Sequence, residues 1–114
     1  MEPLKILIAD KLTPQAMRLQ AQLPPWVQCV GIACDYDTVY SLIESHQPHV
    51  ILLNMNMALV LGNNQFPGQH IIIAIADEAR PEYLRLGLEL KARDLLVQPL
   101  QAGQLGEAIE KAWH

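Results

Sequence analysis

The chain has 114 residues, which is enough for one domain that buries a single hydrophobic core. An apolar content of 51% and a charged content of 18% exclude an intrinsically disordered chain. The formal net charge of −4 argues against direct nucleic-acid binding, which needs a basic face. No apolar run approaches the roughly 18–20 residues of a membrane span, and the N-terminus lacks a signal-peptide pattern, so we expect a cytoplasmic protein without membrane contact.

The cysteine and histidine residues show no pattern of a metal site. Cys29 and Cys34 are five residues apart on a predicted strand and its exit. Odd spacing on a strand places two side chains on opposite faces, so we expect two buried free thiols rather than a disulfide. The histidines are His46, His49, His70 and His114. Their scattered positions predict no metal site and no bound cofactor.

The first third of the chain predicts a strand, a helix and a second strand. Lys5–Asp10 is apolar until its final acid, as in a strand that is buried on both faces. Thr13 is a suitable helix cap and Pro14 suits a first helical turn. Pro24-Pro25 ends this helix. The second strand is predicted over Val27–Ala33.

The middle of the chain predicts a second helix and the central strand. Either Asp35 or Asp37 is positioned to cap the helix, which runs to Gln47-Pro48. His49–Met57 then reads as a short apolar strand with Asn54 near its carboxyl end. In open α/β sheets this end of a strand is where ligands bind.

The remaining chain alternates in the same way. Residues 58–69 leave room for about one or two helical turns before a buried strand at His70–Ala76. A helix from Arg80 to about Leu90 follows, in which Leu84, Gly87 and Leu88 share one face. The last elements are a strand at Asp94–Val97 and a helix at Gln101–Trp113. Alternating helices and all-apolar strands predict a parallel sheet with helices on both faces and right-handed crossovers.

This ordered series resembles a response-regulator receiver domain over nearly the whole chain. The matching segments are Ile6–Asp10, Cys29–Ala33 with Thr38–Ile43, Gln47–Met57, Glu82–Leu84 through Ala92–Asp94, and Gln98-Pro99. The resemblance implies a flavodoxin-like (βα)5 doubly wound α/β sandwich with strand order 2-1-3-4-5. The family usually has a full third helix, but residues 58–69 of this chain are too few for one, so we expect a third helix that is short or missing. It also implies that Gln98-Pro99 is a cis peptide, where the family has a Lys-Pro pair.

The resemblance also identifies a phosphorylation pocket whose residues are largely changed. Asp10 matches the first acid of the family's pair, while Lys11 replaces the second acid, which normally holds Mg²⁺. Asn54 stands at the phospho-accepting aspartate and Gln98 at the lysine that contacts the phosphoryl group. The family's hydroxyl residue falls at Ala76 or at Ile75, and neither has a hydroxyl group. An amide is a poor nucleophile and binds no metal by charge. We therefore expect an absence of phosphotransfer. Two alternatives remain for the pocket: an inert remnant whose polar groups are satisfied, or a pocket in which Asn54 hydrogen-bonds Asp10 or Lys11 and the Lys11 ammonium beside Asp10 imitates the charge of a bound cation.

A degenerate receiver of this kind implies regulation through a protein partner or a homodimer, and no enzymatic activity. In the family the fourth helix, fifth strand and last helix form a common pairing face. Here that face comprises Tyr83, Leu86, Leu90, Arg93, Gln104 and Glu107. We expect residues 1–114 to be one domain, which in the resembled family is followed by an output domain.

The alternative is a small-ligand sensor that uses the pocket at the carboxyl ends of the strands. Against it, residues 10–13 carry no glycine-rich phosphate loop.

Overall fold

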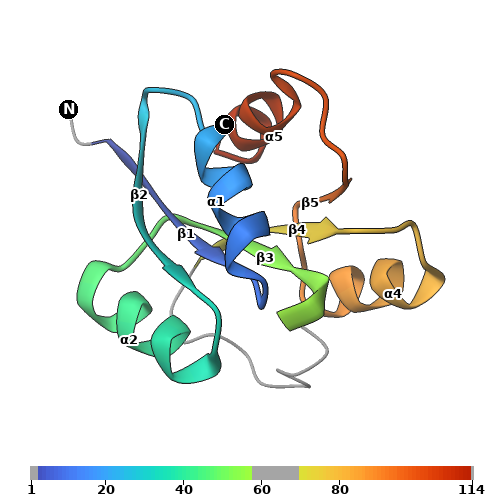
Figure 1. The fold of residues 1–114 in the computed structure, drawn as a ribbon, viewed down its shortest axis with the longest axis horizontal. Coiled ribbons are helices and arrows are strands. Elements are labelled where there is room, and N and C mark those ends of the chain that lie inside the picture. The colour runs from blue at the N-terminus through green and yellow to red at the C-terminus, as the bar shows by residue number, and fades with distance from the viewer. Residues whose placement is uncertain (1–2, 58–69, 114) are drawn as a thin grey trace.

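The computed structural model describes residues 3–57 and 70–113, which form a five-stranded parallel sheet between two layers of helices (Figure 1). The sheet order is β2-β1-β3-β4-β5, which confirms the predicted order. The strands are β1 (Leu4–Ala9), β2 (Val27–Ala33), β3 (Val50–Asn54), β4 (Ile71–Ala76) and β5 (Asp94–Val97).

The helices divide between the two faces of the sheet (Figure 1). They are α1 (Thr13–Ala21), α2 (Tyr36–His46), α4 (Pro81–Glu89) and α5 (Gln104–Trp113). Helices α1 and α5 pack on one face, and α2 and α4 pack on the other. Residues 55–57 form a helical turn, so β3 ends at Asn54 and not at Met57 as the sequence predicted. The predicted short third helix falls on residues 58–69, outside the described residues.

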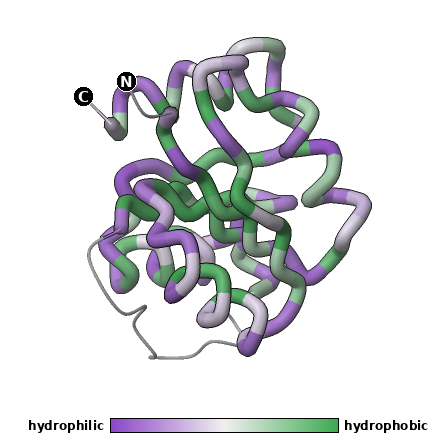
Figure 2. The backbone as a smooth tube through the Cα atoms, turned by 90° about the vertical axis from the view of Figure 1, so that its left-hand side faces the viewer, coloured by the Kyte–Doolittle hydropathy of each residue, from purple (hydrophilic) through white to green (hydrophobic). Residues whose placement is uncertain are grey.

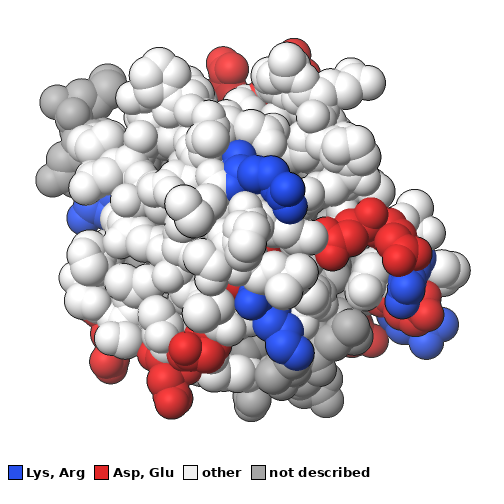
Figure 3. Space-filling model, viewed as in Figure 1, with Lys and Arg blue, Asp and Glu red and all other residues white. Residues whose placement is uncertain are grey.

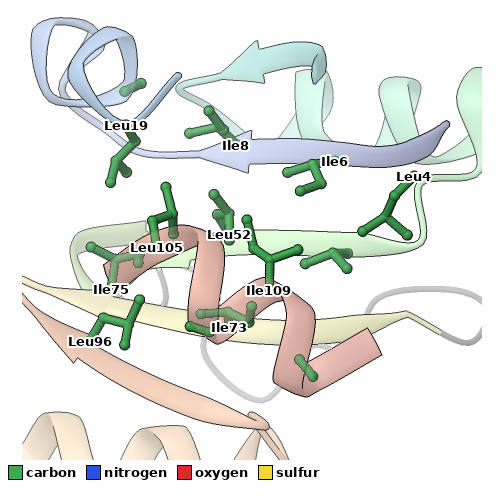
Figure 4. Close-up of a cluster of buried hydrophobic side chains, with 14 residues drawn as sticks. Leu4, Ile6, Ile8, Leu19, Leu52, Ile73, Ile75, Leu96, Leu105 and Ile109 are labelled. Atoms are coloured by element: carbon green, nitrogen blue, oxygen red, sulfur yellow. The ribbon is translucent and has the colours of Figure 1, made fainter. Parts of the chain in front are cut away.

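The strands lack a polar face because both faces of the sheet are covered. On β1, Ile6 and Ile8 pack with α1 and α5, whereas Leu7 packs with the cluster beneath α2 and α4. Figure 4 shows the first cluster, in which Leu105 and Ile109 of α5 lie over the sheet. In Figure 2 the hydrophobic colour accordingly lies mainly in the middle of the molecule.

Two helices begin in different ways. Residue Thr13 does not cap α1: the cap position is Leu12, which makes no side-chain cap bond, and Pro14 lies in the first turn. Helix α2 is capped by Asp35, whose Oδ1 accepts a hydrogen bond from the backbone N–H of Thr38 at 2.8 Å. This bond from the Thr38 backbone, with one from its side chain, lowers the pKa of Asp35.

Helix α4 partly buries residues that the resemblance had assigned to the interaction face. Tyr83, Leu86 and Leu90 pack against the core, while Leu84 is 55% exposed and Leu88 is 80% exposed. Both sets follow helical spacing, so hydrophobic periodicity alone cannot tell the inner face from the outer one.

The surface of the molecule carries scattered charges and one exposed thiol. The face in Figure 3 shows acidic and basic side chains interspersed among uncharged ones. Cys29 is half-buried, and this burial raises the pKa of its thiol. The expectation that both thiols are buried is wrong for Cys34, which is exposed just beyond the end of β2. Among the described helices none is long and apolar enough to cross a membrane.

Candidate functional site

The carboxyl ends of the parallel strands bring the predicted pocket residues to one edge of the sheet. Ala9 is paired with Leu53, so Asp10 and Asn54 follow neighbouring strands at the same level. Further along this edge, β4 ends at Ala76 and β5 is followed by Gln98. The pocket residues that were predicted from the sequence therefore lie at one edge of the sheet.

Asp10 is the centre of a hydrogen-bonded network and is completely buried. Its Oδ2 accepts a hydrogen bond from Asn54 Nδ2 at 3.0 Å. Its Oδ1 accepts one from Asn56 Nδ2 at 3.0 Å and another from the backbone N–H of Leu12 at 2.9 Å. A buried carboxylate is stable only when such bonds replace its lost water. Both oxygens of Asp10 are therefore occupied by N–H donors from this chain.

Asn56 connects the exit of β3 to the loop between β1 and α1. While its Nδ2 donates to Asp10, its Oδ1 accepts the backbone N–H of Lys11 at 3.1 Å. Its own backbone N–H donates to Asn54 Oδ1 at 3.0 Å. A weaker contact joins Asn54 Nδ2 to Gln15 Oε1 on α1, at 3.4 Å. The two loops at this edge are thus joined by side-chain amides; we call this the amide network (Asp10, Gln15, Asn54 and Asn56).

Lys11 does not imitate a bound cation. Lys11 is exposed, and within the described residues its ammonium group forms no ion pair with Asp10. Only its backbone N–H enters the network, through Asn56. The alternative of a cation-like Lys11 is therefore wrong, because neutral N–H donors compensate the buried carboxylate instead. The expected bond between Asn54 and Asp10 is confirmed.

The other half of the pocket contains Ala76 and Gln98. The backbone N–H of Gln98 donates to the carbonyl oxygen of Ala76 at 2.8 Å. Ala76 is fully buried and has no hydroxyl group. The side-chain Nε2 of Gln98 is buried, and it has no hydrogen-bond partner among the described residues. The Gln98-Pro99 bond is cis, as the resemblance implied.

These residues do not fit a magnesium ion. Mg²⁺ binds through hard oxygen ligands in near-octahedral geometry. The only carboxylate of the pocket positions, Asp10, has both oxygens occupied by N–H donors. In the described ranges, no group of three or more His, Cys, Asp or Glu side chains is placed to hold a metal.

Sequence reasoning missed two members of the network, Gln15 and Asn56. Asn56 follows Asn54 by two residues, so both amides emerge at the same end of β3. The sequence signal for Asn56 was that a second polar side chain follows directly after a buried strand. Gln15, in the first turn of α1, carries no signal that distinguishes it from a solvated glutamine.

The predicted interaction face is only partly accessible. Of its six residues, Arg93 and Glu107 are exposed, while Tyr83, Leu86, Leu90 and Gln104 are partly buried. Arg93 also donates through Nη1 to the carbonyl oxygen of Ala112 at 3.0 Å, near the end of α5. The strongly exposed apolar residues of α4 are instead Leu84 and Leu88.

Comparison with solved structures identifies the fold. The chain has a TM-score of 0.79 and 20% identity to the signal receiver domain of the putative response regulator NarL from Mycobacterium tuberculosis, over 99% of this chain and 98% of that one. It has a TM-score of 0.78 and 20% identity to the REC domain of AraT from Geobacillus stearothermophilus, over 97% and 93%. The chain has the receiver-domain fold. A third match, at TM-score 0.82 and 16% identity over 99% and 98%, is to a structure of the P1 domain of CheA3 in complex with CheY6 from R. sphaeroides.

The other two comparisons add no closer relative. No protein-family model and no curated protein matches the chain. The receiver fold is therefore established by the three-dimensional arrangement, which places the amide network at the edge where the resemblance puts the phosphorylation pocket.

Proposed function

We propose that this chain is a regulatory signalling domain of receiver fold that accepts no phosphoryl group and acts through protein–protein contact. The amide network carries the proposal, since it fills both oxygens of Asp10 with donors from Asn54, Asn56 and Leu12. The domain has no enzymatic role in this proposal, and it corresponds to residues 1–114 as one unit of a regulator.

The chemistry of Asn54 supports the absence of phosphotransfer. A phosphoryl acceptor at this position must attack phosphorus with an oxygen that carries negative charge. The amide of Asn54 is neutral, and its nitrogen donates to Asp10 while its oxygen accepts from Asn56. Both ends of the side chain are thus committed to the protein, so neither is available to a phosphodonor.

The same network holds the pocket in one arrangement. It joins the loop after β1 to the turn after β3 through side chains that are buried or partly buried. A phosphorylation switch needs two arrangements of these loops that a phosphoryl group and a cation can bias. With neither able to bind, the domain remains in a single state and presents constant surfaces to a partner.

The exposed leucines of α4 are the surface that we propose for that contact. Leu84 and Leu88 are one helical turn apart, so they form an apolar strip on the outside of α4. Arg85 and Glu89, which are also exposed, flank the strip. Apolar residues bordered by charges are typical of a protein contact surface, either for a partner or for a second copy of the chain.

The phosphotransfer part is tested with acetyl phosphate and MgCl2, followed by intact-mass measurement. We expect no mass increase in the native chain. The matched control is the triple variant Lys11→Asp, Asn54→Asp, Gln98→Lys, which restores the charges of the family pattern, and its labelling shows that the assay detects transfer on this scaffold. Stoichiometric phosphorylation of the native chain would contradict the proposal.

The contact surface is tested by sedimentation velocity across a wide concentration range. If the strip pairs two copies, the native chain dimerises and the double variant Leu84→Ser, Leu88→Ser remains monomeric. If the native chain is monomeric throughout, the partner is another protein, and the same variant should lose that partner in a pull-down. If the variant associates as the native chain does in both assays, Leu84 and Leu88 do not form the contact surface.

A small-ligand site remains the second candidate, because one observation favours it. The buried Nε2 of Gln98 lacks a partner among the described residues, and an unsatisfied buried donor is costly. A ligand carbonyl or anion at this edge could accept its hydrogen bond. A thermal-shift screen with nucleotides and flavins tests this candidate: stabilisation that is lost in Gln98→Leu supports it, whereas an absence of shifts removes it.

A further inference from the structure

The edge of the sheet opposite the amide network carries a second set of contacts, which holds the end of α5. His49, just before β3, meets the Trp113 ring edge-on, with ring centroids 5.0 Å apart and planes at 66°. Arg93, just before β5, donates from Nη1 to the carbonyl oxygen of Ala112 at 3.0 Å. The last turn of α5 is therefore held by side chains from two strand entrances.

The protonation state of His49 follows from its hydrogen bond. The backbone N–H of Lys5 donates to His49 Nδ1 at 2.9 Å. A backbone N–H can only donate, so Nδ1 must present a lone pair and the neutral ring carries its proton on Nε2. The backbone around the ring is fixed, since His49 N donates to Lys5 O at 2.9 Å and Ile71 N donates to His49 O at 3.0 Å.

A second histidine on this edge has the opposite arrangement. His70 Nδ1 lies 2.7 Å from the carbonyl oxygen of Pro48. A carbonyl oxygen can only accept, so this Nδ1 carries the proton in the neutral ring and also in the charged one. Protonation leaves the His70 bond intact but places a new N–H of His49 directly opposite the N–H of Lys5.

We propose that His49 is a pH-sensitive latch on the last turn of α5. Uptake of a proton from solvent at Nδ1 converts the Lys5 bond into an N–H to N–H repulsion. Because the backbone of His49 is fixed by its hydrogen bonds to Lys5 and Ile71, the ring must rotate, and it loses its contact with the Trp113 ring. The last turn keeps the core packing of Ala112 and the bond from Arg93 but loses the ring contact of Trp113, so it opens more often. Histidine is the side chain that ordinarily changes charge between about pH 5 and 8, so the experiment covers this range.

Among the described residues, the charged groups on the neighbouring elements form no ion pair with the His49 ring. The surrounding elements bring Lys5 from β1, His70 before β4, Arg93 before β5, and Glu110 and Lys111 from the last turns of α5. Across the described parts of the chain, His49 forms no ion pair with any of them. The latch is also separate from the amide network, so it stands whether or not the proposed function is correct.

The experiment is an NMR titration of the whole chain from pH 8 to pH 5.5, combined with amide hydrogen exchange. We expect the indole N–H signal of Trp113 and the last amides of α5 to shift together with the ring signals of His49. We also expect exchange protection of those amides, corrected for intrinsic rates, to fall about tenfold, which is the loss of one aromatic ring contact of typical strength.

Two matched variants separate the latch from general acid effects. In His49→Asn the side-chain Oδ1 takes the place of Nδ1 as an acceptor for Lys5 N–H and cannot be protonated in this range, so the response of Trp113 should disappear. In His70→Asn the response should persist. An unresponsive Trp113 in the native chain, or an unchanged response in His49→Asn, overturns the proposal. Should His49→Asn fail to fold, the native titration alone decides: α5 signals that do not follow the His49 ring overturn it.

Discussion

Replacement of Asn56 by alanine is the most direct test of the amide network. The change removes the donor to Asp10 Oδ1 and the acceptor of Lys11 N–H, both from one side chain. It leaves Asp10 buried with two donors, Asn54 Nδ2 and Leu12 N. The Lys11 amide is at the surface, so water replaces its lost acceptor at little cost.

The expected loss of stability follows from the remaining bond. A hydrogen bond to a charged group contributes roughly 1.5–3 kcal/mol, so we expect Asn56→Ala to lower the free energy of unfolding by about 2–3 kcal/mol. For a domain of this size that corresponds to a melting temperature lower by about 6–15 °C. The assay is urea unfolding followed by circular dichroism, with Gln28→Ala on the exposed side of β2 as a surface control.

A second variant at the same position identifies the cause. Asn56→Asp keeps an oxygen for Lys11 N–H but puts a second carboxylate against Asp10. We expect this variant to be less stable than Asn56→Ala at neutral pH, and to recover on addition of Mg²⁺ more than the native chain does, since two carboxylates attract the cation. A loss below about 0.5 kcal/mol in Asn56→Ala, which is the usual effect of a surface substitution, would refute the structural role of the network.

Three further predictions test the fold around the site. Leu88→Ser should change the free energy of unfolding by less than about 0.5 kcal/mol because Leu88 is exposed. Leu86→Ser should lower it by more than about 1 kcal/mol because Leu86 packs on the core. Equal effects in urea unfolding would contradict the orientation of α4, in which Leu86 faces the core and Leu88 faces solvent. The bond from Thr38 N–H to the Asp35 carboxylate stabilises the fold above pH 3.8, and this stabilisation is lost as the pH falls through the lowered pKa of Asp35. The melting temperatures of the native chain and of Asp35→Ala should therefore differ at pH 7 and converge near pH 2. A difference that stays constant with pH would contradict the capping role of Asp35. A disulfide reagent at pH 8 should label Cys34 rapidly and Cys29 slowly, since burial raises the pKa of Cys29 and the thiolate is the reactive form; equal rates would contradict this burial.

The orientation of α4 shows what an amino-acid pattern leaves open. The helix was predicted correctly, and so was its start near Pro81. Its inner face was not predictable, since Leu84 with Leu88 and Tyr83 with Leu86 and Leu90 both repeat at helical intervals. Only packing against the sheet distinguishes them, because it fixes which side of the helix loses contact with water.

The polar contacts divide in the same way. The bond between Asn54 and Asp10 was predictable, since each follows a buried strand and neighbouring parallel strands end at one edge. The participation of Asn56 was not, because it depends on the turn after β3 directing its amide toward Asp10. Likewise, the contact between His49 and Trp113 joins residues 64 positions apart in sequence, and no local pattern encodes it.

The sequence by itself determined the strands, the helices and their order, because apolar runs, prolines and caps act within a few residues of their own position. It also determined which chemical groups stand at the strand ends: an amide at Asn54, no hydroxyl at Ala76 and no cation at Gln98. The tertiary structure decided what those groups contact. The compensation of buried Asp10 by amides rather than by Lys11, and the holding of α5 by His49, depend on distances between elements that only the packed sheet sets.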